Sequence, residues 1–190
     1  MNSIRLSKRA SALALASVFA IGAAMLSSQS AHAGSTPANL AVSASVAANC
    51  TITTTAVAFG PYDPVVTNGS AGVDLNGNGT VVIGCTKGSA PNVTLGLGLH
   101  AAGAVRNMLV TGGGTDTLTY ELYQPPNNAA GTTCTFPGAQ VWGTVGGAVF
   151  TPTAPTSKAT RTYNVCGTVT KNQDVSVGTY NDTVVATVNF

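Results

Sequence analysis

Charged side chains are scarce in this sequence. Only 7% of its 190 residues are Asp, Glu, Lys or Arg, and three of the eight cations, Arg5, Lys8 and Arg9, stand near the N-terminus. The other five are scattered among six acids, so no basic patch can neutralise phosphates, which excludes a nucleic-acid partner. Charged helix formers are equally few, and no segment after the N-terminal region has the periodicity of a helix.

Side chains that carry catalysis or bind metals are also rare. The two histidines are His32 and His100, and neither a G-x-S-x-G motif nor a C-x-x-C pair occurs. The segment DLNGNGT, residues 74–80, begins like a calcium loop, but Cys85 stands where that loop requires Glu, so we expect a turn. The sequence therefore predicts no enzyme, no cofactor and no metal site, with His100 in a solvated loop.

The N-terminal region has the three parts of a secretory signal peptide. Its cations precede an apolar run at residues 10–26, and the small-x-small sequence Ala31-His32-Ala33 follows. A transmembrane anchor is the alternative, but the run is short, contains Ser11 and Ser17, and leads into a cleavage signal. We therefore assign residues 1–33 to a cleaved leader and expect an exported mature chain.

All four cysteines lie in the mature chain, and an even number in an exported protein predicts two disulfides. Four cysteines allow three pairings. The pairing that is local in sequence, Cys50–Cys85 with Cys134–Cys166, is favoured. Each bond would close a loop of about 35 residues, which limits its stabilisation to about 4 kcal/mol.

Gly, Thr, Val, Asn and Ala dominate the mature chain, and turn signals recur about every 8–12 residues, as in antiparallel β-sandwiches and barrels. No linker divides the chain into two domains. The sequence therefore predicts a single all-β domain. We expect its strands near residues 50–59, 79–86, 91–99, 116–124, 159–169 and 179–190.

Strand-like segments stand at both ends of the mature chain. In NLAVSASVAANC, residues 39–50, the alternating apolar positions are Leu40, Val42, Ala44 and Val46. In GTYNDTVVATVNF, residues 178–190, they include Val184, Ala186, Val188 and Phe190. After Asp182 this last strand carries no charge, Pro or Gly to protect an open edge. We expect an N-terminal segment to cover it, either from the same molecule or from a second one, as in pilin donor-strand complementation.

Five segments of the chain resemble, in the same order, the spore coat protein U-like domain family. They are CTITTTAVAFGPYDP (50–64), TVVIGCTKG (80–88), LTYELY (118–123), VWGTV (141–145) and GTYNDTVVATVNF (178–190). The last motif is the most specific. The family includes the shaft subunits of archaic, Csu-type chaperone–usher pili.

The resemblance implies an incomplete immunoglobulin-like antiparallel β-sandwich that lacks its last strand. Residues 34–48 would be an N-terminal donor strand and residues 49–190 the sandwich domain, with Cys50–Cys85 as the family disulfide. The implied donor residues are Leu40, Val42, Ala44 and Val46. The implied acceptor groove contains Val184, Ala186, Val188 and Phe190. A periplasmic chaperone would fill the groove first, and the next copy of the chain would replace it after passage through an outer-membrane usher.

The function implied is a structural subunit of a surface fibre, exported through the periplasm to the cell surface, that supports adhesion or biofilm formation. The alternative is a secreted coat or carbohydrate-binding adhesin module that does not polymerise. Trp142 and five tyrosines would be available to stack on sugars, although packing in the core is favoured for them. A small secreted hydrolase is a third hypothesis, and the lone His100 of the mature chain argues against it.

Overall fold

The computed structural model describes residues 33–190, so the predicted leader lies outside the described residues except for Ala33. The chain forms two units, one that ends at Ser43 and the compact unit Ala44–Phe190. Residues 33–49 have no regular secondary structure. Within residues 33–190, no helix has the length and apolar character needed to cross a membrane.

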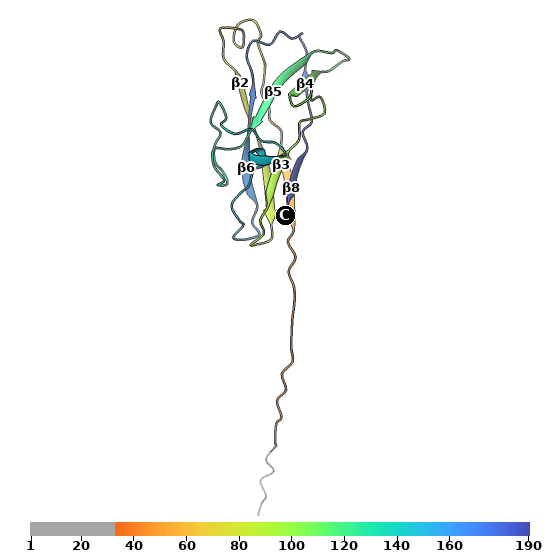
Figure 1. Ribbon diagram of the computed structural model, residues 1–190, viewed down its shortest axis with the longest axis vertical. Coiled ribbons are helices and arrows are strands. Elements are labelled where there is room, and N and C mark those ends of the chain that lie inside the picture. The colour runs from red at the N-terminus through yellow and green to blue at the C-terminus, as the bar shows by residue number, and fades with distance from the viewer. Residues whose placement is uncertain (1–32) are drawn as a thin grey trace, which may run out of the picture. The chain divides into compact units, whose positions relative to one another are not determined.

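The compact unit is built from antiparallel β-strands (Figure 1). They are β1 (Cys50–Thr55), β2 (Leu75–Cys85), β3 (Asn92–Leu95), β4 (Arg106–Val110), β5 (Thr117–Tyr123), β6 (Arg161–Val169), β7 (Tyr180–Asn181) and β8 (Ala186–Asn189), with a 3₁₀ turn, η1 (Gly146–Ala148). One sheet has the order β1-β2-β6-β5-β4-β7, and β3 pairs with β8 in a second sheet. The predicted all-β fold is confirmed.

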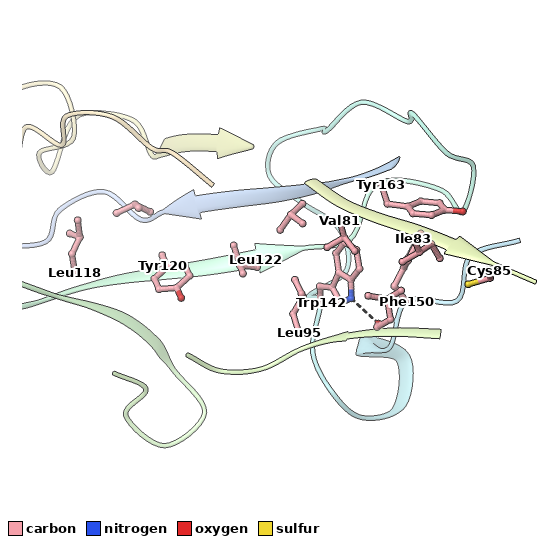
Figure 2. Close-up of a cluster of buried hydrophobic side chains, with 13 residues drawn as sticks. Val81, Ile83, Cys85, Leu95, Leu118, Tyr120, Leu122, Trp142, Phe150 and Tyr163 are labelled. Carbon is pink, nitrogen blue, oxygen red and sulfur yellow. Dashed lines mark hydrogen bonds between the residues drawn. The ribbon is translucent and has the colours of Figure 1, made fainter. Parts of the chain in front are cut away.

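The core lies between these two sheets and is closed by the long connection from β5 to β6. Alternate residues of the central strands point inward, because side chains on a strand alternate between its two faces. The connection contributes Trp142 and Phe150, whose ring centroids lie 4.9 Å apart. The Trp142 Nε1 donates a hydrogen bond to the Val93 carbonyl at 2.9 Å (Figure 2). The buried hydrophobic residues include Val81, Ile83, Leu95, Leu118, Tyr120, Leu122, Tyr163 and Val165.

The turn predicted for residues 74–80 is wrong, because β2 already begins at Leu75. The glycines at positions 77 and 79 of β2 allow residues 55–59 to pack closely against this strand. A Cβ on Gly79 would lie 2.6 Å from the Thr55 carbonyl oxygen, and one on Gly77 would lie 2.8 Å from the Ala58 carbonyl oxygen. Only glycine therefore leaves room for residues 55–59 to pass over β2. No cluster of three or more possible metal ligands occurs among the described residues.

The strand β4 was missed by the sequence reading, because its sequence RNMLV opens with two polar residues that occupy buried positions. The Arg106 side chain is only 1% exposed and forms an ion pair with Glu121. Its remaining donors bind main-chain carbonyls of the second sheet and of the β5–β6 connection. Nη2 donates to Gly96 O at 2.8 Å and to Trp142 O at 2.7 Å. A buried charge with these partners ties the two sheets together.

Both favoured disulfides are present. Cys50–Cys85 joins β1 to β2 at directly paired positions, with the Cα atoms 4.1 Å apart. Cys134–Cys166 joins the β5–β6 connection to β6. The first bond therefore holds the edge strand β1 on its sheet at the end where the chain enters the compact unit.

The strand predicted for residues 91–99 ends early, since β3 stops at Leu95. Leu97 and Leu99, which alternate with Gly96 and Gly98 in the predicted strand, are 42% and 73% exposed. The chain turns at Gly98, which has φ +94°, a value that favours glycine. This turn presents the next backbone N–H groups to Asp182, so a hydrogen-bonding requirement has overridden the alternating pattern.

Candidate functional site

The C-terminal segment changes sheets. β7 pairs with β4 in the large sheet, and β8 pairs with β3 in the small one. Residues 182–185 between them belong to no strand, although Val185 O accepts a hydrogen bond from Gly96 N at 2.9 Å. The predicted alternation survives, with Asp182, Val184, Ala186 and Val188 half-buried and the residues between them exposed. The predicted continuous strand at 179–190 is nevertheless wrong, because the segment is split.

The side chain of Asp182 fixes this change of sheet. It is 3% exposed, and its Oδ2 accepts from the Tyr120 hydroxyl at 2.6 Å. Its Oδ1 accepts from Leu99 N at 2.9 Å and from His100 N at 3.2 Å, and the His100 ring lies against the same oxygen with Nδ1 at 3.1 Å. His100 is therefore paired with a carboxylate rather than merely solvated.

The environment shifts the pKa values of this cluster. Burial acts to raise the pKa of Asp182, but the hydrogen bonds from Tyr120 and from backbone N–H groups outweigh it and hold the pKa below its usual range. Burial, together with the neighbouring Asp182 carboxylate, raises the pKa of Tyr120 far above its ordinary value. The cluster is thus a charged carboxylate held by a neutral phenol, an arrangement that positions the backbone.

An open groove of about 350 Å³ lies between the end of β1 and residues 180–186. Its lining is largely apolar, and several lining side chains also pack against the buried core while staying partly exposed. These core-contacting residues are Val57, Phe59, Met108, Tyr180, Val184 and Ala186. The hydrophobic interior of the sandwich therefore reaches solvent along this groove.

A second hollow, of about 660 Å³, continues the groove. It is bordered by residues 57–62 and Pro64 on one side and by residues 175–181 on the other. The two hollows share Val57, Phe59 and Met108, so we treat them together as one feature, the open groove. The second hollow lies among the loops that follow β1 and β6, and we call this end of the open groove its mouth.

Strand edges without a second partner among the described residues border parts of the open groove, at Thr54 and Thr55 of β1, at β7 and at Ala186 of β8. β1 pairs only with β2, and β8 pairs only with β3. Cα atoms of β1 and β8 approach within 8 Å, so the walls converge along β8. The open length is therefore bounded by residues 54–59 and 180–186.

The structure distributes the four predicted groove residues unevenly. Val184 and Ala186 line the open groove. Val188 pairs with Val93 and packs on the core, and Phe190, after the end of β8, is 56% exposed. The sequence reading did not name the opposite wall at Val57 and Phe59, although the alternation in AVAF, residues 56–59, was a usable signal.

The four predicted donor residues lie in the segment before β1. Val46 belongs to the compact unit and is 85% exposed, while Leu40 and Val42, in the preceding unit, are each 87% exposed. Ala44 is also exposed. Residues 44–49 form no strand, and Thr86 holds their end through a hydrogen bond from its Oγ1 to the Ala47 carbonyl at 3.3 Å. The start of the compact unit therefore leaves its own groove unfilled.

The sequence matches the family model of the Spore Coat Protein U domain over residues 36–187. It is also 36% identical over 183 residues to Protein U of Myxococcus xanthus, an alignment that covers 88% of this chain and 92% of that protein. The chain belongs to the Spore Coat Protein U domain family. The resemblance seen in the sequence motifs is thereby confirmed.

Two solved structures of pilus components are also similar. One is the CsuC–CsuE chaperone–tip adhesion subunit pre-assembly complex from archaic chaperone–usher Csu pili of Acinetobacter baumannii, with a TM-score of 0.48 and 23% identity over 76% of this chain. The similarity spans only 40% of that chain. The other is the minor tip subunit HdaB of the E. coli Hda pilus, with a TM-score of 0.36 and 19% identity over 73% of this chain and 79% of that one. The family to which this chain belongs is named for a structural coat protein, which confirms the prediction that this protein is not an enzyme.

Proposed function

We propose that this protein is the structural subunit of a secreted surface fibre, in which the N-terminal segment of one copy fills the open groove of the next. The observation that carries the proposal is the groove itself. It exposes core-contacting side chains between two strand edges that have no partner in the described chain. A strand added there would supply both missing backbone hydrogen bonds and missing apolar cover.

The N-terminal segment has the composition that such a strand requires. One face of the segment would be apolar, and the residues that alternate with it are small enough to pack closely against neighbouring strands. The apolar residues are Leu40, Val42, Ala44 and Val46. Each buried Leu or Val contributes about 1.5–3 kcal/mol and each ladder hydrogen bond about 0.5–1.5 kcal/mol. Ordering the segment costs about 1–2 kcal/mol per residue. These terms nearly cancel, so the main gain is closure of the acceptor's core.

Geometry favours insertion into another copy. The chain enters the compact unit at the Cys50 end of β1, whereas the mouth of the open groove lies beyond the Thr55 end. A head-to-tail contact between these two different ends does not close on itself and generates a filament. A donor that enters through the mouth with its N-terminus first runs antiparallel to residues 180–186 and parallel to β1.

The groove would be exposed to solvent before assembly, which is the reason to include a chaperone and an usher in the proposal. An uncovered apolar groove with free strand edges promotes aggregation. We therefore include a periplasmic chaperone that covers the groove and an outer-membrane usher that exchanges the chaperone for the next copy. Display on the cell surface, adhesion and biofilm formation complete the proposed role.

The test is a pair of variants of the donor segment. Val42→Asp places a charge on the apolar face, where burial without a partner is costly, so we expect loss of polymers that survive mild denaturant. Ser43→Asp places the same charge on the opposite face and should still polymerise. Deletion of residues 34–47 should abolish fibres in electron micrographs while chaperone binding persists. Fibres from the deleted chain would refute donor-strand exchange.

A secreted coat protein that does not polymerise is the second candidate. One observation favours it: the family to which the chain belongs is named for a spore coat protein. This candidate predicts a stable soluble monomer when the chain is expressed without a chaperone. The fibre hypothesis predicts polymers, aggregates or degradation under the same conditions.

A further inference from the structure

Most charged residues of the compact unit lie near one or the other of its two ends, and five of these eight residues are exposed. One end, here called the acidic end, carries Asp63, Asp74, Asp116 and Asp174 with a single cation, Lys171. The other, here called the basic end, carries Lys87, Lys158 and Arg161. The remaining charged side chains, Arg106, Glu121 and Asp182, are engaged with one another or with Tyr120 and His100 in the interior between the two ends.

Strand register and hydrogen bonds place the acidic residues together. Leu75 at the start of β2 pairs with Val169 at the end of β6, and just beyond them Lys171 N donates to Asp74 Oδ1 at 2.9 Å. Ser176 N donates to Asp116 Oδ2 at 2.8 Å, which joins the β4–β5 loop to the same end. The loop of Asp63 is joined to it by its neighbour Tyr62, whose hydroxyl donates to Thr170 O at 3.1 Å. Four acids against one cation leave this end with a net of three negative charges.

The basic end lies at the opposite termini of the same strands, where Ile83 pairs with Arg161. The loops that carry Lys87 and Lys158 are joined by a hydrogen bond from Gly88 N to Pro155 O at 2.9 Å. The C-terminal carboxylate lies toward this end as well, since Asn189 pairs with Asn92 (Figure 1). Three cations against that carboxylate leave a net of two positive charges.

We propose that the basic end of one copy docks on the acidic end of the next and aligns the two for strand insertion. This inference rests on the proposed function, because the donor segment and the open groove would bring these two ends together. The N-terminal segment joins the compact unit at the basic end, where Asn49 N donates to Thr86 Oγ1 at 3.1 Å, next to Lys87. The mouth of the groove lies at the acidic end, bordered by residues 60–62, Pro64 and residues 175–178.

The acidic end also offers apolar contact area to the docked copy. Its loops expose Val65, Val66, Val73 and Val177, at 83%, 73%, 65% and 102% of their full areas. The opposing charges determine which end of a second copy meets these side chains, since like ends repel. Charge complementarity of this kind acts mainly on the rate and orientation of encounter.

The salt dependence of assembly follows from screening. Charges on facing ends interact over about 30 Å at 0.01 M salt but over only about 8 Å at 0.15 M. We therefore expect polymerisation of the mature chain to be on the order of tenfold faster at 0.01 M than at 0.5 M NaCl.

The decisive variants reverse one end or both. Lys87→Glu with Lys158→Glu makes both ends acidic, and polymerisation at low salt should slow by about tenfold or more. Adding Asp74→Lys and Asp174→Lys in the same chain inverts both ends, restores the complementarity and should restore the rate. All four positions are exposed, so these changes leave the core intact. Asp74→Ala is the control for loss of the hydrogen bond from Lys171 N, and because its end stays acidic it should polymerise at nearly the wild-type rate. Equal rates for all three chains, or a fourfold variant as slow as the double one, would overturn the proposal.

Light scattering of the same chains separates this proposal from the fibre hypothesis. One outcome is that mature chains attract one another at low salt, that the double variant abolishes this attraction, and that no denaturant-resistant polymers form. This outcome would support end-to-end docking and refute the fibre. Polymers that form at the same rate at low and high salt, and in the charge-reversed variants, would support the fibre and refute docking of the two ends. Absence of both attraction and polymers would refute both.

Discussion

Replacing Asp182 with Asn tests whether the change of sheet depends on one carboxylate. Asn retains an acceptor oxygen for the N–H groups of Leu99 and His100 but loses the charge, and it turns an NH₂ group toward the Tyr120 hydroxyl. Hydrogen bonds to charged groups contribute about 1.5–3 kcal/mol, against about 0.5–1.5 kcal/mol for neutral ones. We expect a loss of about 2 kcal/mol in the free energy of unfolding.

Urea denaturation followed by tryptophan fluorescence is a suitable assay, because Trp142 is fully buried in the same core. A loss of this size corresponds to a fall in Tm of about 4–8 °C for a domain of this length. Asp174→Asn is the matched control, since Asp174 is exposed, and it should change stability by less than about 0.5 kcal/mol.

The pH dependence gives this prediction its sharpest form. The pKa of Asp182 is lowered in the folded protein, so its contribution is complete above the unfolded-state value of about 3.9 and is lost as the pH falls through the folded value. The stability gap between wild type and Asp182→Asn should therefore be constant from pH 7 to about pH 5 and narrow below about pH 4. A gap that is absent at pH 7, or that stays unchanged down to pH 2, would contradict this account.

Three further substitutions test other parts of the fold. Arg106→Met leaves Glu121 without its partner and strips donors from three buried carbonyls, so we expect a loss of about 3–5 kcal/mol, and adding Glu121→Gln should recover part of it. Gly79→Ala forces apart the chain that crosses β2 and should cost about 1–3 kcal/mol in urea denaturation. Replacing Cys50 and Cys85 with Ser should cost up to about 4 kcal/mol and increase amide hydrogen exchange in β1, while the same change at the other disulfide should leave β1 exchange unaltered.

The sequence was sufficient for features that depend on local periodicity. The alternation in the last segment correctly identified the inward-facing side chains from Tyr180 to Val188, though not Phe190, and locality in sequence correctly paired the cysteines. These predictions succeed because a strand alternates its side chains whether or not its neighbours are known.

The predictions that failed depended on contacts distant in sequence. Residues 76–79 look like a turn until the chain at 55–59 is seen to require glycines beneath it. Arg106 looks like a surface cation until the carbonyls of Gly96 and Trp142 are seen to surround it. The split at 182–185 arises because one acid binds a loop more than 80 residues away in sequence. No local pattern encodes such partners.

The same split explains why the groove remains open in this fold. Residues 182–185 are held by side-chain and loop contacts on the side of β3 and β5, through Asp182 and through the Val185 carbonyl. Their position is therefore fixed without a neighbouring strand on the side that faces β1. In the proposed fibre, this held but unpaired segment would be the preformed template for an incoming strand. In that proposal, the buried Asp182 carboxylate is the group that holds the open side of the sandwich in place before the donor strand is added.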